Sequence, residues 1–245
     1  MLLPVLLTIG AGTSARGSEL TRENSRRALS YRERLELAVP EFRAGGRSLV
    51  EVAVSMAYRY KLPMAIEHVD GTALHRPVSL KLEHQSVRHV LAAVIALVPG
   101  YRVEFSRGLV DIYSLAARGD PSNPLNTVIS HYDVDGLDTH LADAELLCDL
   151  TREMHGNAGC GGSVASGQWG NRKINLHLSH RRVFEILNAI VAQNGEALWV
   201  PIAWSVSHSG VMRNFWYIYP LEPSLEGSVI EGLRALLPRG NRDRR

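Results

Sequence analysis

The chain has 245 residues, 45% of them hydrophobic, and its 27 basic and 25 acidic side chains leave a formal net charge of +2. This length suits one large domain or two small ones. Nucleic-acid-binding proteins usually carry a strong basic patch or stripe, so the balanced charge argues against a nucleic-acid partner. Beyond the N-terminus no stretch is apolar for long enough to cross a bilayer, and we expect no transmembrane segment.

The N-terminal residues have the pattern of an export signal. An apolar run from Leu2 to about Ala11 is followed by small and polar residues, and Thr13 and Ala15 could form a small-x-small cleavage site. No Lys or Arg precedes the run, which leaves a buried N-terminal strand as the alternative. We predict a signal peptide over residues 1–17 and a periplasmic or secreted protein.

The two cysteines, Cys148 and Cys160, form a candidate disulfide. An oxidising compartment outside the cytoplasm would permit a bridge between them. The alternative is two unpaired thiols, one on a helix face and one in a glycine-rich loop.

The first half of the chain begins with the charged residues 18–45, which we interpret as a linker or lead-in, with a short helix over 28–37 that Pro40 ends. Residues 46–116 then alternate between helical and extended patterns. The expected elements are a helix over 48–60, strands over 62–69 and 76–83, a helix over 86–98, and a hairpin of 101–105 and 109–113 with its turn at 106–108.

The second half repeats this order of elements. Residues 117–126 are rich in Pro, Gly and Asn and are interpreted as a linker, after which residues 127–222 form the second unit. The expected elements are a strand over 126–134, a helix over 141–155, a strand over 173–179, a helix over 181–193 capped by Gly195, and strands over 196–206 and 214–221. The apolar side of helix 141–155 is expected to hold Leu141, Leu146, Leu147 and Leu150. The C-terminal tail, 223–245, is expected to contain one short helix over 229–237.

An internal repeat is the clearest signal in the sequence. An offset of 96 positions places residues 78–96 over residues 174–192 without a gap, so that Leu80 matches Leu176. The matched positions keep the alternation of a strand and the spacing of a helix, which indicates one strand–helix unit built twice. Leu91 and Leu187 are then predicted to be buried at equivalent sites. The alternative is chance similarity between two amphipathic segments.

The repeated unit is similar to a known family. The apolar residues that carry the similarity follow a helix, a V-x-L-x-L strand, a second helix and a hairpin: Leu49, Val52, Val78, Leu80, Leu82, Val87, Leu91, Val94, Tyr101, Val103, Val110 and Ile112. They resemble the STN domain, the short N-terminal domain of secretins and of TonB-dependent signal-transducing receptors. The resemblance covers residues 46–115, and residues 127–221 look like a diverged copy. It implies an α+β fold of two small STN-like α/β units, each with two helices packed on short mixed sheets.

The resemblance also implies a function. STN domains are periplasmic modules for protein–protein contact, in the rings of secretins or between receptors and regulatory partners. The family supplies no catalytic residues and no cofactor. We therefore expect a non-enzymatic interaction or assembly module whose partner is an envelope protein or a second copy of the chain.

Histidine, aspartate and cysteine residues in the second half leave an alternative open, an envelope hydrolase or metal-binding protein. The dense group consists of His131, Asp133, Asp135, Asp138, His140 and Asp143. Such a group can mark a metal site, or a solvated strand edge followed by a helix cap at Asp138 or Thr139. The CGGS segment at 160–163 could hold a nucleophile, or be a flexible surface loop. His84 and His180 match in the repeat and are expected near the starts of its helices.

Aromatic residues are concentrated on the last two expected strands. They alternate along those strands, which predicts one face in the core and one face available for contact. Because Trp and Tyr are favoured at the centres of interfaces, the candidate interface consists of Trp204, Trp216, Tyr217 and Tyr219. The alternative is that these rings belong to the core.

Overall fold

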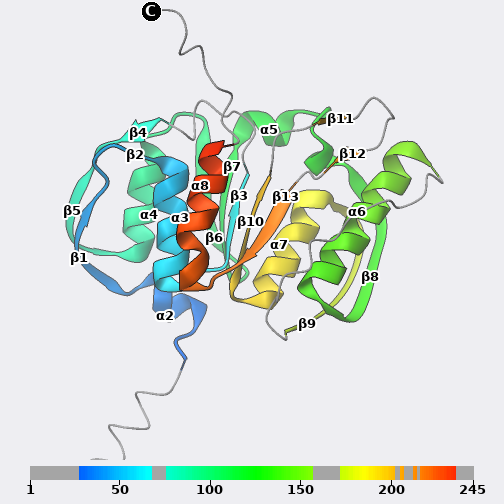
Figure 1. Ribbon diagram of the computed structural model, residues 1–245, viewed down its shortest axis with the longest axis horizontal. Coiled ribbons are helices and arrows are strands. Elements are labelled where there is room, and N and C mark those ends of the chain that lie inside the picture. Colours follow the sequence, from blue (N-terminus) through cyan, green and yellow to red (C-terminus); the bar gives the residue numbers. More distant parts are fainter. Residues whose placement is uncertain are drawn as a thin grey trace, which may run out of the picture. The chain divides into compact units, whose positions relative to one another are not determined.

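The computed structural model describes residues 28–67, 76–156, 172–201, 205–206, 212–213 and 216–235 (Figure 1). From Tyr31 onward the chain forms one compact unit. The predicted signal peptide, the CGGS segment with Cys160, and Trp204 lie outside the described residues, so those predictions stay open. Within the described ranges, every helix is too short or too polar to span a membrane.

The fold is mixed α+β, as predicted. The helices are α2 (Tyr31–Leu35), α3 (Leu49–Tyr60), α4 (Val87–Ala96), α5 (Leu115–Gly119), α6 (Thr139–His155), α7 (Val183–Asn194) and α8 (Glu226–Ala235), with the 3-10 turns η1 (Pro124–Asn126) and η2 (Pro223–Leu225). The strands are β1 (Ala38–Arg43), β2 (Arg47–Ser48), β3 (Met64–Ile66), β4 (Pro77–Val78), β5 (Lys81–Ser86), β6 (Tyr101–Ser106), β7 (Leu109–Ser114), β8 (Val128–Asp138), β9 (Lys173–Arg182), β10 (Ala197–Pro201), β11 (Ser205–Val206), β12 (Met212–Arg213) and β13 (Trp216–Pro220).

Local sequence explains where several elements begin and end. Helix α3 starts with a capping box, in which Ser48 Oγ accepts from Glu51 N at 3.3 Å and Glu51 Oε2 accepts from Ser48 N at 2.8 Å. Helix α7 ends at Gly195, whose φ of 74° allows the left-handed cap that was predicted. The predicted β6–β7 hairpin turns at Arg107 and Gly108, both with positive φ, as a tight two-residue turn requires.

A five-stranded sheet contains strands from both halves of the chain, in the order β13-β10-β3-β7-β6. Each hairpin, β6–β7 and β10–β13, is antiparallel, and β3 lies between them in parallel with both β7 and β10. The boundaries predicted at 46–116 and 127–222 therefore do not separate two independent sheets. The second half adds its hairpin to the free side of β3 and extends the sheet of the first half.

The central sheet separates two hydrophobic clusters. Alternate residues of a strand point to opposite faces, and Met64 and Ile66 of β3 belong to the first cluster whereas Ala65 belongs to the second. Helices α3, α4 and α8 contribute side chains to the first cluster, and α6 and α7 to the second. Figure 1 shows this division, with α3, α4 and α8 on one side of the central strands and α6 and α7 on the other.

The two halves share the same ribbon register, which supports the repeat. In the first half Phe42 of β1 pairs with Leu82 of β5, and in the second half Tyr132 of β8 pairs with Leu178 of β9. The remaining pairs follow the same correspondence: Ala38↔Ser86 with Val128↔Arg182, Glu41↔Glu83 with His131↔Ser179, and Arg47↔Val78 with Leu137↔Ile174. The offset of 96 positions found in the sequence thus holds between β5 and β9.

Matching irregularities occur at matching places in the two ribbons. His84 and His180 have φ of 53° and 50°, and each interrupts the pairing of its ribbon. Gly46 and Gly136 also match, with φ of 75° and 61°. The two histidines lie near the helix starts, as expected, but they are strand residues two positions before the N-caps Ser86 and Arg182 and do not begin the helices.

The helices that precede the repeated strands also match. The N-cap residues Ser48 of α3 and Asp138 of α6 occupy equivalent ladder positions, opposite Pro77 and Lys173. The second helices carry Leu91 and Leu187, which are 1% and 0% exposed in the first and second cluster respectively. The prediction of equivalent buried leucines in separate clusters is confirmed.

The copies are turned over relative to each other in the sheet. Strands β6 and β10 match at the offset of 96, yet the pairings give them opposite directions. In the sheet order the hairpin partner lies on the same side of each strand, β13 beside β10 and β7 beside β6, so the reversed direction exchanges the faces of the two copies. For this reason the paired helices α3 and α4 lie on one face and α6 and α7 on the other.

Two segments that were predicted to be connectors are part of the packed structure, and so is the tail, where α8 confirms the short helix that was expected. Residues 38–43 of the lead-in form β1, and only 31–35 are helical. The linker 117–126 holds the end of α5 and η1, with Leu125 buried. The tail supplies α8, whose Val229 and Leu233 join the first cluster. The predicted apolar side of α6 is correct except for Leu141, which is 43% exposed.

Candidate functional site

The predicted aromatic interface is divided by the faces of β13. Trp216 is buried in the second cluster, and its indole Nε1 donates to a carboxylate oxygen of Asp143. Tyr217 and Tyr219 lie on the opposite face, with ring centroids 5.8 Å apart. Tyr217 is 37% exposed, whereas Tyr219 is half-buried against the first cluster. Of the described members, Tyr217 is the one whose ring is most available for contact.

The predicted metal-type residues are not brought together. His131, Asp133 and Asp135 lie on the exposed face of the β8–β9 ribbon, whereas Asp138 is the N-cap of α6, and His140 and Asp143 lie on that helix. The neighbour of Asp133 and Asp135 is His177 of β9, which was not in the predicted group. His177 Nδ1 is 3.3 Å from Asp133 Oδ1, and His177 Nε2 is 3.3 Å from Asp135 Oδ1. All three side chains are more than 60% exposed, and exposed ion pairs of this kind contribute little to stability. Among the residues that the structure describes, no group of three or more His, Cys, Asp or Glu is arranged to hold a metal ion.

The predicted disulfide cannot be assigned from the described residues. Cys148 is half-buried on α6, and Cys160 lies outside the described ranges. The bridge stays a prediction.

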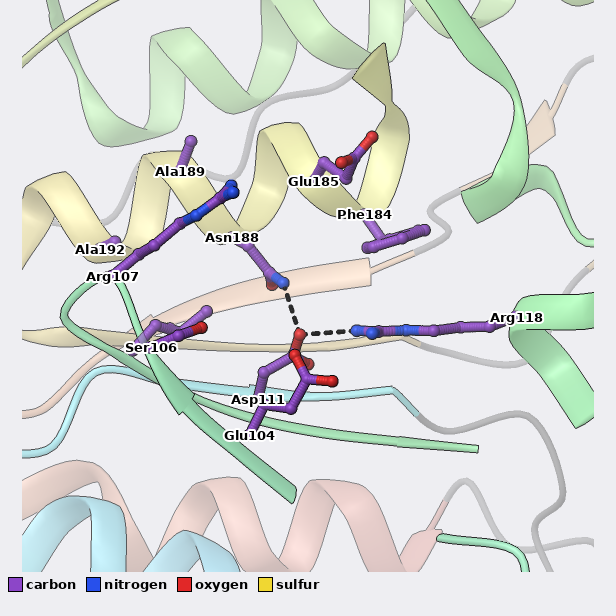
Figure 2. Close-up of a pocket in the computed structure, with 11 residues that line it drawn as sticks. Glu104, Ser106, Arg107, Asp111, Arg118, Phe184, Glu185, Asn188, Ala189 and Ala192 are labelled. Atoms are coloured by element: carbon purple, nitrogen blue, oxygen red, sulfur yellow. Dashed lines mark hydrogen bonds and ion pairs between the residues drawn. The ribbon is translucent and has the colours of Figure 1, made fainter. Parts of the chain in front are cut away.

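A pocket of about 440 Å³ lies where the β6–β7 hairpin faces α7 (Figure 2). Strands β6 and β7 and their turn supply one wall, and α7 supplies the other. The lining residues are Glu104, Ser106, Arg107, Leu109, Asp111, Arg118, Phe184, Glu185, Asn188, Ala189 and Ala192. The charged members are three carboxylates and two guanidinium groups, so the pocket suits a polar or charged group better than an apolar one.

An ion network centred on Arg118 forms the inner end of this pocket. Arg118 Nε lies 3.1 Å from both carboxylate oxygens of Glu67, and its Nη2 donates to Asp111 Oδ2 at 2.6 Å. The guanidinium carbon is 3.5 Å from the ring centroid of Tyr113 and 4.5 Å from that of Phe184. The cation is thus held by two acids and contacts two aromatic rings.

The network continues into the second half of the chain. Asn188 Nδ2 of α7 donates to Asp111 Oδ2 at 2.9 Å, and Trp199 Nε1 of β10 donates to Asn188 Oδ1 at 2.8 Å. Figure 2 shows Asn188 and Arg118 approaching Asp111 from two directions. The hydrogen bonds therefore connect β7 and α5 of the first copy with α7 and β10 of the second.

Burial dominates the electrostatics of the two acids. It raises the pKa of Glu67 to about 7, although hydrogen bonds from Arg118 act in the opposite direction. Burial also raises the pKa of Asp111 above its usual range, against the effect of Arg118. Asp111 Oδ1 is buried with no hydrogen-bond partner among the described groups. One guanidinium thus faces two carboxyls, one of which is poised to hold a proton near neutral pH.

The depth of these groups determines what they can do. The Glu67 side chain is 1% exposed and that of Asp111 is 9% exposed. Both acids are buried at the junction, where their hydrogen bonds with Arg118 and Asn188 join the two copies. Glu104 and Glu185 are nearer the surface; Glu104 accepts from Tyr113 Oη at 2.6 Å, and Glu185 accepts from Arg182 N at 2.9 Å.

Sequence reasoning missed this network, although two signals were present. Asp111 interrupts the apolar strand LVDIY, and Asn188 stands where the repeat has Ala92. A polar residue at a position that the pattern makes apolar requires a buried partner. The partners Glu67 and Arg118 gave no such signal, because they lie at a strand end and in the expected linker.

Comparison with known proteins gives no identification: no family model, curated protein or solved structure matches the chain.

Proposed function

We propose that the chain is an exported, non-enzymatic module for protein–protein contact or assembly, built from two diverged STN-like units. The observation that supports it most is the junction between the copies. There β10 of the second copy binds the edge of β3 from the first in parallel, with Leu198 opposite Met64 and Trp199 opposite Ala65. One unit thus serves as the binding surface for the other, by strand addition.

The remaining strands offer further edges of the same kind. Ribbons β1–β5 and β8–β9 are two-stranded within the described residues, and β6 ends the order of the central sheet. An unpaired strand edge presents backbone donors and acceptors to another chain. A protein with several such edges suits multiple contacts within an envelope assembly.

The alternative is an envelope hydrolase or metal-binding protein that uses the His, Asp and Cys residues of the second half. Of these residues, Asp133 and Asp135 lie beside His177, and all three side chains are exposed and do not line the charged pocket. A His177→Ala variant that lost binding of Zn²⁺ in calorimetry would favour this alternative.

Photo-crosslinking in the producing cell tests the proposal. Benzoylphenylalanine placed at Glu41 in β1, at Arg102 in β6 or at Asn175 in β9 reports contacts at three edges, and Glu231 on the exposed side of α8 is the matched control. We expect discrete heavier adducts from at least one edge position, in the envelope fraction, and none from Glu231. Adducts that are absent from all three edges, or a chain confined to the cytoplasm, would contradict the proposal.

A further inference from the structure

Strands β6 and β10 are equivalent in the two copies. Each follows the second helix of its copy and forms an antiparallel hairpin with the next long strand, with Tyr101 opposite Ser114 and Ala197 opposite Pro220. The offset of 96 places Arg102 on Leu198. What one of these strands binds at its outer edge is therefore a guide to what the other can bind.

The outer edge of each strand is here the edge away from its hairpin partner. The outer edge of β10 is paired with strand β3. Strand β3 lies along it in parallel, so that Ala65 faces Trp199 and Met64 faces Leu198. The occupant is a short extended segment, with a small residue on the side of α7 and a larger apolar residue on the other side.

The equivalent edge of β6 has no strand beside it among the described residues. Its two faces differ. Val103 and Phe105 pack against the first cluster, and the Arg88 guanidinium carbon lies 4.8 Å from the Phe105 ring centroid. Arg102 and Glu104 are exposed on the opposite face of β6, whereas Leu198 and Val200, at the equivalent positions of β10, are fully buried. The backbone of this edge is equivalent to that of β10, but its outer side chains are charged.

We propose that the outer edge of β6 binds an extended segment of a partner protein in parallel, with an acidic, an apolar and a basic residue opposite Arg102, Val103 and Glu104. This inference rests on the proposed function, and it specifies the sequence chemistry of the partner segment at the β6 edge. The parallel direction and the register come from β3 on β10. The charges come from the rule that opposite charges facing each other across a strand pair are favourable and like charges are not.

The neighbouring pocket favours the same order of charges. Glu104 lines the pocket together with Asp111 and Glu185, on the face that the partner's third residue would share. A lysine or arginine there would extend towards Glu104 and Glu185, the two carboxylates of the pocket that lie nearer the surface. The order basic–apolar–acidic would instead place a carboxylate beside those acids and a cation beside Arg102.

Peptide binding with a charge exchange tests this proposal. The probe is a fluorescent twelve-residue peptide of Thr and Ser with Asp-Val-Lys at its centre, and its matched control has Lys-Val-Asp. Anisotropy is measured with the full chain and with the double variant R102E/E104R, whose changes are confined to exposed side chains. We expect the natural chain to prefer Asp-Val-Lys about tenfold, and the double variant to prefer Lys-Val-Asp by a similar factor.

The direction of the strand is tested with a nitroxide at the N-terminus of the peptide. In a parallel complex it broadens the amide resonances near Arg102 more than those near Ser106. Broadening at Ser106 instead, equal affinity for the two peptides, or a preference that the double variant does not reverse would overturn the proposal. A concentration-dependent dimer that the double variant abolishes would make a second copy the occupant and would also overturn it.

Failure here can be distinguished from failure of the proposed function. Adducts from Glu41 or Asn175 without any from Arg102 would leave a contact protein whose β6 edge is not used.

Discussion

Strands β6 and β10 occupy equivalent places in the two copies but differ in what covers them. On the face that packs against their own helices both are apolar, with Val103 in one and Trp199 in the other. On the other face β10 carries Leu198 and Val200, buried in the cluster that α8 completes, whereas β6 carries exposed charges. The side chains that face the strand's own helices are thus apolar in both copies. The side chains on the other face differ, because the two strands have different neighbours there.

The Arg118 network is a second point at which the copies diverge, and removing its cation should have the largest effect. Arg118→Leu leaves Glu67 and Asp111 buried without a counter-charge, and loss of one partner of a buried ion pair costs about 3–5 kcal/mol. Urea unfolding at pH 8 measures the loss. Arg102→Leu, which removes an exposed arginine nearby, is the control and should change stability by less than about 0.5 kcal/mol. A loss below about 1 kcal/mol for Arg118→Leu would show that the network does not hold the copies together.

The equivalent leucines test whether the two clusters are energetically matched. Leu91→Ala and Leu187→Ala should each reduce the free energy of unfolding by about 2–5 kcal/mol. Because they lie in clusters on opposite faces of the sheet, their effects should be nearly additive. The shared strand β3 should nevertheless keep a single unfolding transition.

Two exposed leucines serve as controls for this pair. Leu97 at the end of α4 and Leu141 on α6 are 46% and 43% exposed, and their alanine variants should change stability by less than about 1 kcal/mol. Two resolved transitions in the natural chain, seen by calorimetry, would mean that the copies unfold independently despite the common sheet.

The pH dependence of the free energy of unfolding should report on Glu67, the buried acid of the network at the junction of the copies. The pKa of Glu67 is raised from 4.5 to about 7, chiefly by burial, so the folded state binds a proton more tightly than the unfolded chain. The stabilisation from this proton is complete below about pH 4.5 and is lost as the pH rises to about 7. We expect the stability difference between the natural chain and Glu67→Gln to change in that window. A difference that is constant from pH 4.5 to 8 would show that Glu67 ionises normally.

The smallest effect is expected at the two matched histidines. His84→Gly and His180→Gly remove the strain of a positive φ in the folded state but increase the conformational entropy of the unfolded chain. Because these effects oppose each other, each substitution should change the free energy of unfolding by less than about 1 kcal/mol. The informative result is their agreement in sign and size, since the two interruptions of the ladder are equivalent. His89→Gly, at an exposed position in helix α4, is the control and should destabilise by about 1 kcal/mol. Opposite signs at His84 and His180 would argue against equivalent interruptions.

Periodicity predicted the units well because each is local. The strand–helix segments, the β6–β7 hairpin and the caps at Ser48 and Gly195 depend on neighbours in the sequence. Strand β1 was missed because Pro40 suggested the end of a helix. In the structure Pro40 lies opposite His84, where the ladder is interrupted and no backbone donor is needed. Its counterpart in the second ribbon is Ser130, which gave no such false signal.

The arrangement of the units could not be read from periodicity. A short apolar strand such as Met64–Ile66 could lie at the edge of a sheet formed by one unit or in the centre of a sheet shared by two units. Only its partners, β7 on one side and β10 on the other, show that it is central. The Arg118 network could not be predicted from periodicity either, because Glu67 and Arg118 are separated by 51 residues in the sequence. The repeat predicted matching strand–helix segments in the two halves but not that β10 of the second half would pair with β3 of the first.

Helix α8 has a consequence for the order in which the molecule can form. It places Val229 and Leu233 in a cluster whose other buried members come from the first half, except for Leu198, Val200 and Leu221. A chain that emerges N-terminus first, from a ribosome or a membrane channel, presents α3 and α4 long before their cover arrives. Contacts between such distant segments slow folding, and apolar surface left open in the meantime is prone to aggregate. The half of the protein that is made first is therefore the half whose core is completed last, and its apolar surface stays open longest during synthesis.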